Sequence, residues 1–140
     1  MFDIILLAVD GSEHGQHAAK VAGDLARAVQ ARELHIVVAC EPVPRYVTEP
    51  NLGVALAERS AGAQQILKKA QETVGSLPAK ISPEIVEGTI AEAILDVAKA
   101  RSCEVIVMGS RGFGRLEGAV LGSNSQKVVS HAPCPVLIVR

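Results

Sequence analysis

The sequence predicts an α/β fold: a five-stranded, parallel, doubly wound (Rossmann-like) sheet with helices on both faces. Short apolar runs without alternation occur at residues 4–9, 36–40, 105–108 and 136–139, which is typical of strands buried on both faces. Helical periodicities separate these runs, and such an alternation favours parallel strands joined by right-handed crossovers. We expect one domain over residues 1–140 and the strand order 3-2-1-4-5.

A further strand is expected at residues 80–87, where apolar and polar residues alternate. Pro83 lies within it and has no backbone N–H, so it cannot take part in hydrogen-bonded ladders on both sides. This strand therefore belongs at an edge of the sheet.

Three helices are predicted from apolar residues at helical spacing in residues 18–29, 56–74 and 90–98. Residues 89–92 read Thr-Ile-Ala-Glu, a capping box that opens the third helix. Residues 123–126 read Ser-Asn-Ser-Gln, a second capping box, and this one predicts a short fourth helix.

The strand within residues 135–140 is apolar and belongs at the other edge, where nothing that follows it covers its unpaired backbone. Exposed apolar edge strands promote pairing with another chain. We expect a homodimer in which two copies of this strand pair about a two-fold axis.

Composition excludes several classes of function. The 14 basic and 15 acidic residues nearly balance, and no Lys/Arg stripe of the kind that binds nucleic acid is present. The apolar run at residues 4–9 is too short for a signal peptide or a membrane span. Cys40, Cys103 and Cys134 lack CxxC spacing and sit in apolar surroundings, so we expect reduced, mostly buried thiols and a cytoplasmic protein.

A glycine-rich loop follows the strand at residues 105–108: residues 109–123 contain five glycines and two arginines. Glycine allows positive φ and close approach of a ligand to backbone N–H groups, and a helix N-terminus adds unpaired donors, so the loop is suited to phosphate. Its spacing fits neither a Walker A loop nor a dinucleotide fingerprint. A flexible connection without a ligand is the alternative interpretation.

The predicted strand order places this loop beside Asp10-Gly11-Ser12, at the point where the winding of the sheet reverses and ligands of such sheets bind. Asp10 has two interpretations: a ligand contact to base or ribose donors, or the N-cap of the following helix. Residues 41–53 show no periodicity and are predicted to form either a binding loop or a surface excursion. His14 and His17 share a helix face, but without carboxylate partners we expect solvated side chains and no metal site.

The spacing Gly109-x2-Gly112-x9-Gly122-Ser123 resembles the nucleotide-binding pattern G-x2-G-x9-G-[ST] of the universal stress protein family. The resemblance extends along the chain through ILLAVDGS, EGTIAEAILDVA, VIVMGSRG and HAPCPVLIVR. It implies a small cytoplasmic dimer with a sheet like that of the adenine nucleotide alpha hydrolases, binding ATP, or AMP or ADP, with Mg²⁺ at the reversal point.

Site residues follow from this resemblance by position. It implies adenosine contacts from Ala8, Val9 and Asp10, an adenine contact from Ala39, ribose contacts from Met108 and Gly109, and phosphate contacts from Gly112, Gly122, Ser123 and Asn124. Asn124 departs from the valine that is common in the family at this position. The chemistry of the loop itself adds the hydroxyl of Ser125 and the charge of Arg111.

Three functions are consistent with these observations. The first is an ATP-binding stress-response or signalling protein regulated by its nucleotide, and the complete glycine spacing favours it. The second is a dimeric interaction module of the same fold without a nucleotide. The third is a hydrolase or transferase, which the missing general base disfavours, so at most slow ATP hydrolysis is expected.

Overall fold

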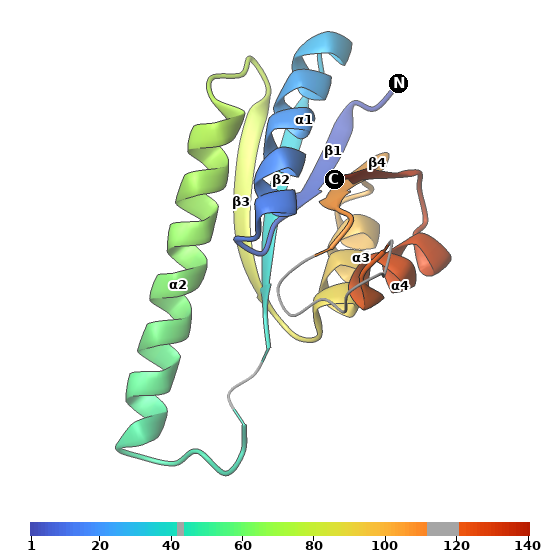
Figure 1. Cartoon of the computed structure of the whole chain (residues 1–140). Coiled ribbons are helices and arrows are strands. Elements are labelled where there is room, and N and C mark those ends of the chain that lie inside the picture. The colour runs from blue at the N-terminus through green and yellow to red at the C-terminus, as the bar shows by residue number, and fades with distance from the viewer. Residues whose placement is uncertain (42–43, 112–120) are drawn as a thin grey trace.

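A computed structural model of the chain describes residues 1–41, 44–111 and 121–140. Within these residues five strands and four helices alternate (Figure 1): β1 (Ile4–Ala8), α1 (Glu13–Val29), β2 (Glu33–Cys40), α2 (Asn51–Val74), β3 (Lys80–Glu87), α3 (Ile90–Ala100), β4 (Val105–Gly109), α4 (Ser123–His131) and β5 (Val136–Val139). The strands form one parallel sheet in the order β3-β2-β1-β4-β5. The predicted fold class and strand order are confirmed.

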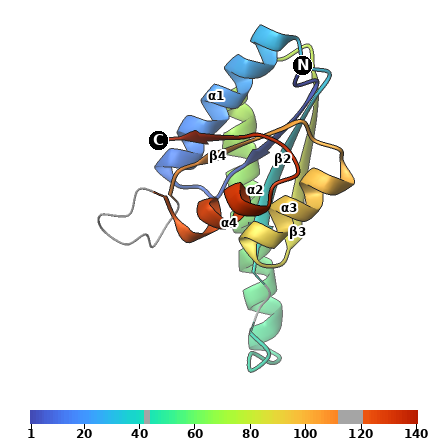
Figure 2. The same cartoon turned by 90° about the vertical axis from the view of Figure 1, so that its right-hand side faces the viewer.

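The sheet separates two hydrophobic cores, because successive side chains of a strand point to opposite faces. Ile5 and Leu7 of β1 pack into the core beneath α1 and α2, whereas Leu6 and Ala8 pack into the core beneath α3 and α4. Figures 1 and 2 show the two helix pairs on opposite faces of the sheet. All four side chains are buried, which confirms the expectation that β1 is covered on both faces.

β3 and β5 form the two edges of the sheet. Pro83 of β3 lies opposite Ile36 of β2, but the N–H groups of Lys80 and Gly88 point toward β2, so the nitrogen at the odd-numbered position 83 faces the open side of the edge and its missing N–H costs no ladder hydrogen bond. The edge position predicted for this strand is confirmed. At the other edge, β5 leaves the Leu137 side chain 38% exposed.

The starts of α2 and β2 differ from the prediction. Helix α2 begins at Asn51 and not at Leu56, and its first half projects past the sheet, where Leu56 is exposed and not buried as its spacing predicted (Figure 1). The aperiodic connection is correspondingly shorter than residues 41–53, and residues 42–43 of it lie outside the described residues. Strand β2 begins at Glu33 and not at Ile36. The Glu33 carboxylate lies 3.0 Å from Nε2 of the buried His35, and because both residues are polar, a search for apolar runs does not include this part of the strand.

Both predicted capping boxes form differently from the standard pattern. Thr89 is the N-cap of α3, but its hydroxyl donates to Glu92 Oε2 at 2.8 Å and not to or from the backbone. That hydrogen bond, with the ammonium of Lys127, lowers the pKa of the Glu92 carboxyl. At α4 the N-cap is Gly122 and not Ser123, because the Gly122 N–H donates to the Ser110 carbonyl and holds Gly122 extended until the helix begins.

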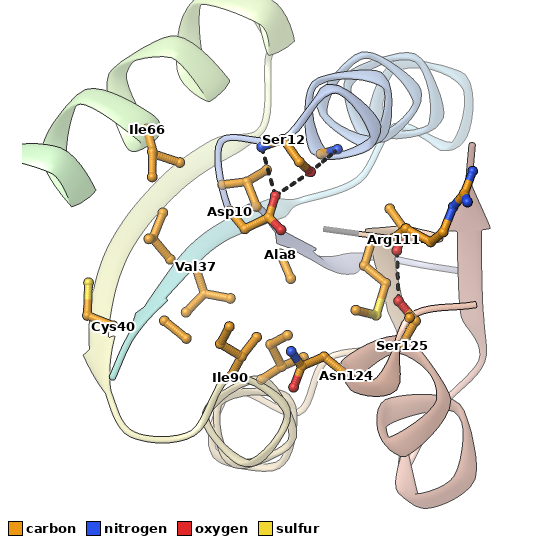
Figure 3. A pocket seen from close by; sticks show the side chains of 18 of the residues that line it. Ala8, Asp10, Ser12, Val37, Cys40, Ile66, Ile90, Arg111, Asn124 and Ser125 are labelled. Atoms are coloured by element: carbon orange, nitrogen blue, oxygen red, sulfur yellow. Dashed lines mark hydrogen bonds between the residues drawn. The ribbon is translucent and has the colours of Figure 1, made fainter. Parts of the chain in front are cut away.

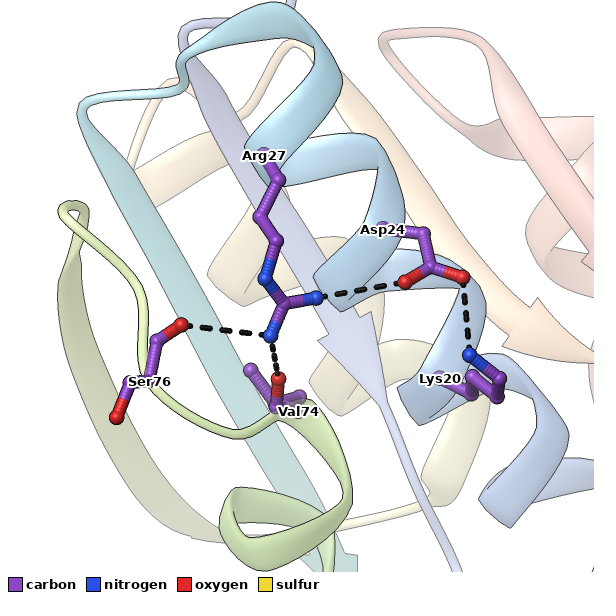
Figure 4. A network of polar contacts seen from close by, with 5 residues as sticks. All are labelled: Lys20, Asp24, Arg27, Val74 and Ser76. Atoms are coloured by element: carbon purple, nitrogen blue, oxygen red, sulfur yellow. Dashed lines mark hydrogen bonds and ion pairs between the residues drawn. The ribbon is translucent and has the colours of Figure 1, made fainter.

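Arg27 of α1 links this helix to the carboxyl end of α2 through hydrogen bonds (Figure 4). Its Nη2 donates to the carbonyls of Val74 and, at 3.3 Å, of Ser76, while Nη1 donates to Asp24 at 3.4 Å. Carbonyls in the last turn of a helix have no partner within the helix, so a cation there both satisfies and stabilises them. The contact helps to fix α2, which forms one wall of the site described below.

No helix in the described parts of the chain combines the length and the apolar character that crossing a membrane requires.

Arg27→Met keeps the aliphatic stem and removes the donors, so we expect a loss of about 1–2 kcal/mol in the free energy of unfolding. Arg101→Met is the matched control: Arg101 makes only an exposed ion pair with Glu84 at 3.6 Å, and its loss should change stability by less than about 0.5 kcal/mol. Urea unfolding followed by circular dichroism measures both. Equal midpoints for Arg27→Met and the wild type would show that this link contributes nothing.

Candidate functional site

A pocket of about 700 Å³ lies beyond the carboxyl ends of β1, β2 and β4, where the winding of the sheet reverses. Its floor is the ends of these strands, and its walls come from α2, from the start of α3 and from the start of α4 (Figure 3). The described residues of its lining include Ala8, Val9, Asp10, Ser12, Gly15, Val37, Ala39, Cys40, Arg59, Gly62, Ile66, Ile90, Ile94, Met108, Gly109, Arg111, Gly122, Ser123, Asn124 and Ser125.

The geometry of the turn after β1 shows whether Asp10 is the N-cap of α1. Ser12 is the N-cap of α1, and its Oγ accepts the Gly15 N–H at 3.2 Å. Asp10 Oδ1 accepts both the N–H of Ser12, at 2.9 Å, and its hydroxyl. Gly11 between them has φ 84°, a conformation that favours glycine. Asp10 therefore orients the cap and is not the cap, and no described residue donates to its Oδ2.

Gly109, at the end of β4, owes its identity to packing. A Cβ atom built there would lie 2.8 Å from His14 Cβ and 2.9 Å from the His14 carbonyl carbon, so only glycine lets β4 approach the first turn of α1 this closely. Positive φ, which the sequence suggested for this loop, is not used at Gly109 or at Gly122, where φ is −69°. The backbone conformation of Gly122 is one that any residue can adopt, so it does not by itself require glycine.

The N-terminus of α4 forms what we call the polar end of the pocket, made of Arg111, Gly122, Ser123, Asn124 and Ser125. No side chain of the described residues caps this helix, and its first turn holds no acidic residue, so its N–H groups and positive dipole end are available to an anion. The hydroxyl proton of Ser125 is already donated to the Gly109 carbonyl at 2.9 Å. Arg111 Nε is buried without a hydrogen-bond partner among the described residues.

The opposite side of the pocket, which we call the apolar end, is made of Val37, Ala39, Ile66, Ile90 and Ile94. Figure 3 shows Val37 and Ile66 on one side of the pocket and Arg111 and Ser125 on the other, with Asp10 between them. Arg59 of α2 also lines the pocket and donates to the Glu41 carbonyl just after β2. The described residues of the lining thus carry two guanidinium groups and one carboxylate, an excess of positive charge.

The structure brings the predicted site residues together. Ala8, Val9, Asp10, Ala39, Met108, Gly109, Arg111, Gly122, Ser123, Asn124 and Ser125 all line the pocket, and Gly112 lies outside the described residues. Ser12, in the turn predicted to lie at this point, also lines the pocket, and so do four residues that were not predicted to lie there: Arg59, Ile66, Ile90 and Ile94. Ile66, Ile90 and Ile94 belong to apolar helical patterns, which predict burial in a core and contain no signal that distinguishes a residue at the pocket.

The two histidines on α1 are not simply solvated. His14 Nδ1 lies 2.7 Å from Ser110 Oγ, and His17 Nδ1 lies 2.8 Å from the Arg140 carbonyl. Within the described ranges, no group of three or more His, Cys, Asp or Glu residues is arranged to hold a metal ion.

The cysteines differ in their surroundings. All three are free thiols. Burial raises the pKa of the Cys103 thiol to about 11, with a smaller contribution from the nearby Cys134, whereas Cys40 is partly exposed and lines the pocket. A thiol with so high a pKa holds little reactive thiolate at neutral pH.

The fold and the pocket define a doubly wound α/β protein with a ligand site at its switch point. A model of the universal stress protein family matches residues 1–140. The "Universal stress protein in QAH/OAS sulfhydrylase 3'region" of Thermus aquaticus is 46% identical over 140 residues, covering 100% of both chains. The chain belongs to the universal stress protein family.

Solved structures agree with this assignment. Universal stress protein UspA from Lactobacillus plantarum is 30% identical with a TM-score of 0.87, covering 99% of this chain and 98% of its own. A universal stress protein solved in complex with cAMP is 25% identical with a TM-score of 0.75, covering 99% of this chain and 97% of its own.

Two glycines at the pocket give a matched test of their roles. Gly109→Ala should destabilise the protein by about 1–3 kcal/mol, because the methyl group must displace the backbone of α1. Gly62→Ala, in the interior of α2 with nothing within 4 Å of the added Cβ, should instead stabilise the protein by about 0.5–1 kcal/mol through helix propensity. Thermal and urea unfolding measure both changes. If Gly109→Ala is as stable as the wild type, the close packing of β4 on α1 is not required.

Proposed function

We propose that the protein binds an adenine nucleotide, with ATP as its ligand, in the pocket beyond β1, β2 and β4. The observation that carries the proposal is the separation of the pocket into an apolar end and a positively charged polar end that contains an uncapped helix N-terminus. A flat apolar base and an anionic phosphate tail are the two parts that such a pocket suits. The relative solved with cAMP supports the nucleotide class.

The charges and hydrogen bonds favour one orientation of this ligand. The base lies at the apolar end, against Ile66, Ile90 and the end of β2 near Ala39. The ribose lies between the two ends, where Asp10 Oδ2 accepts from its hydroxyls, because a carboxylate would repel phosphate. The phosphates lie against the N-terminus of α4 and Arg111, and Ser125 contributes its backbone N–H because its hydroxyl proton is committed to Gly109.

Mg²⁺ enters this proposal with the phosphates. The described residues that line the pocket offer a single carboxylate, that of Asp10, which is too few oxygen ligands for an all-protein magnesium site. As the alternative to a direct ribose contact, Asp10 and the nucleotide phosphates together supply a donor set that fits a hydrated Mg²⁺ ion. In that position the ion would neutralise phosphate charge.

We propose a binding and signalling role in the cytoplasm over an enzymatic one. General-base catalysis needs a group poised to take a proton from water, and Asp10, the one carboxylate in the described lining, already orients Ser12. Hydrolysis of bound ATP would therefore be slow. A dimeric interaction module without a nucleotide is the competing function, and nucleotide titration separates the two.

We also propose a homodimer through β5, with bound nucleotide altering contacts with the second copy or another partner. Leu137 of β5 is partly exposed on an edge strand that pairs with β4 on one side only. Pairing of two such edges satisfies their backbone groups and covers this side chain. The three free thiols are compatible with a reducing compartment.

Calorimetric titration with ATP, ADP, AMP and cyclic AMP, each with and without Mg²⁺, tests the nucleotide site. Wild type should bind, and Gly122→Val should bind more than about tenfold more weakly, because valine accepts the extended conformation of Gly122 but adds bulk where phosphate lies. Gly53→Val, on an exposed turn of α2, is the matched control and should bind normally. No heat with any nucleotide, or equal titrations of wild type and Gly122→Val, would overturn the proposal.

Alkylation with iodoacetamide at pH 8 gives the same titration a second readout. ATP should slow the labelling of Cys40, which lines the pocket, and leave the labelling of Cys134 unchanged. Cys103 should label slowest with or without ATP, since at a pKa of about 11 only about a thousandth of it is thiolate at pH 8. Mass spectrometry of the peptides resolves the three sites.

Leu137→Lys tests the dimer, because a lysine on an edge strand opposes pairing with a second edge. We expect wild type to sediment as a dimer and Leu137→Lys as a monomer in analytical ultracentrifugation. Val129→Lys, which replaces an exposed apolar residue on α4, should remain dimeric. A monomeric wild type, or a dimer that survives Leu137→Lys unchanged, would contradict pairing through β5.

A further inference from the structure

Ser110 stands out because it is buried between residues of the polar end without lining the pocket itself. It follows Gly109 and precedes Arg111, both of which line the pocket, yet it is only 2% exposed. A polar side chain buried this deeply requires hydrogen-bond partners. The hydroxyl, the backbone N–H and the backbone carbonyl of Ser110 each have one, and the three partners come from different parts of the chain.

The first two partners join the glycine loop to itself and to α1. The Ser110 carbonyl accepts the N–H of Gly122 at 2.8 Å, which brings the two described ends of the loop together. The Ser110 hydroxyl lies 2.7 Å from Nδ1 of His14, in the first turn of α1. Ser110 thus fixes the residue that caps α4 against the helix that packs on β4.

The third partner joins the loop to the edge strand. The Ser110 N–H donates to the Val139 carbonyl at 2.7 Å, which extends the β4–β5 ladder by one bond. The next residue of the chain, Arg140, is held by His17 of α1, whose Nδ1 lies 2.8 Å from the Arg140 carbonyl. The end of β5 and the start of α4 are therefore fastened to the same buried residue and the same helix.

We propose that Ser110 is a positioning residue for the phosphates of the bound nucleotide and couples their binding to the end of β5. This inference rests on the proposed nucleotide binding. The hydroxyl acts at a distance: it holds the peptide whose carbonyl fixes Gly122, and Gly122 sets where the first N–H groups of α4 point. An anion bound to those groups in turn holds Gly122, Ser110 and, through the backbone, Val139.

Ser110→Ala removes the hydroxyl and keeps the backbone bonds, so the proposal predicts a loss that depends on the ligand. ATP should bind about three- to tenfold more weakly, the effect of losing one ordinary hydrogen bond that positions the site. Adenosine, which has no phosphate, should bind as it does to wild type. Ser130→Ala, which removes an exposed hydroxyl from α4 that donates to the Gln126 carbonyl, is the control and should bind both normally.

Calorimetry with ATP and adenosine on the three proteins distinguishes this inference from the proposed function. If wild type binds no nucleotide, both are overturned. If wild type binds ATP but Ser110→Ala binds it equally well, or loses ATP and adenosine in equal proportion, the inference alone is overturned, because a purely structural role would weaken the whole site. His14→Ala removes the partner of the Ser110 hydroxyl, so it should weaken ATP binding at least as much as Ser110→Ala does, and adding Ser110→Ala to His14→Ala should weaken it little further.

Hydrogen exchange measured by mass spectrometry tests the coupling to β5. ATP should slow exchange in the peptide spanning residues 136–140 of wild type and Ser130→Ala, and should slow it less in Ser110→Ala at equal ATP saturation. Adenosine should leave this peptide unchanged in all three proteins. Equal slowing by ATP in Ser110→Ala, or equal slowing by adenosine and ATP in wild type, would overturn the coupling.

Discussion

The close packing of β4 against the first turn of α1 is the contact on which the pocket depends. A Cβ atom added to Gly109, at the carboxyl end of β4, would lie 3.1 Å from the Gly15 nitrogen, so the packing leaves no room for a side chain there. Because β1 and β4 are neighbours and their crossovers leave in opposite directions, this contact sets the distance between the turn after β1 and the loop after β4. The pocket is the space that remains between them and α2.

Residue size along the strands explains why a cavity forms at one end of the sheet and not in its middle. The centres of β1 and β4 carry Leu6, Leu7, Ile106 and Val107, all fully buried between the helix layers. At the carboxyl ends the strands finish in small residues, Ala8, Ala39 and Gly109 among them, so the floor of the pocket is low. With only 2% aromatic residues in the chain, no large ring is available to fill the space from a wall.

The order of elements and the position of the site were predictable because both follow from patterns that are local in sequence. Buried parallel strands leave continuous apolar runs, and the glycine spacing from Gly109 to Gly122 marks the loop. The start of α2 was missed because its first half is exposed on most sides and carries no apolar period. The N-cap of α4 was misplaced because the hydrogen bond that the Gly122 N–H donates to the carbonyl of Ser110, twelve residues earlier, decides it. Arg59 and Ile66 were not predicted at the pocket because they are distant in sequence from β1 and β2, and only folding brings α2 to the ends of these strands.

The polar groups around the pocket are already committed to the fold, and this bears on what such a pocket can do. Asp10 holds the cap of α1, Ser125 bonds to Gly109, and Arg59 bonds to the carbonyl after β2. Groups fixed in this way bind a ligand without the cost of ordering them, which favours affinity. The same bonds remove the freedom to accept and return protons that acid–base chemistry requires. A pocket built in this manner is better suited to bind a ligand than to transform it.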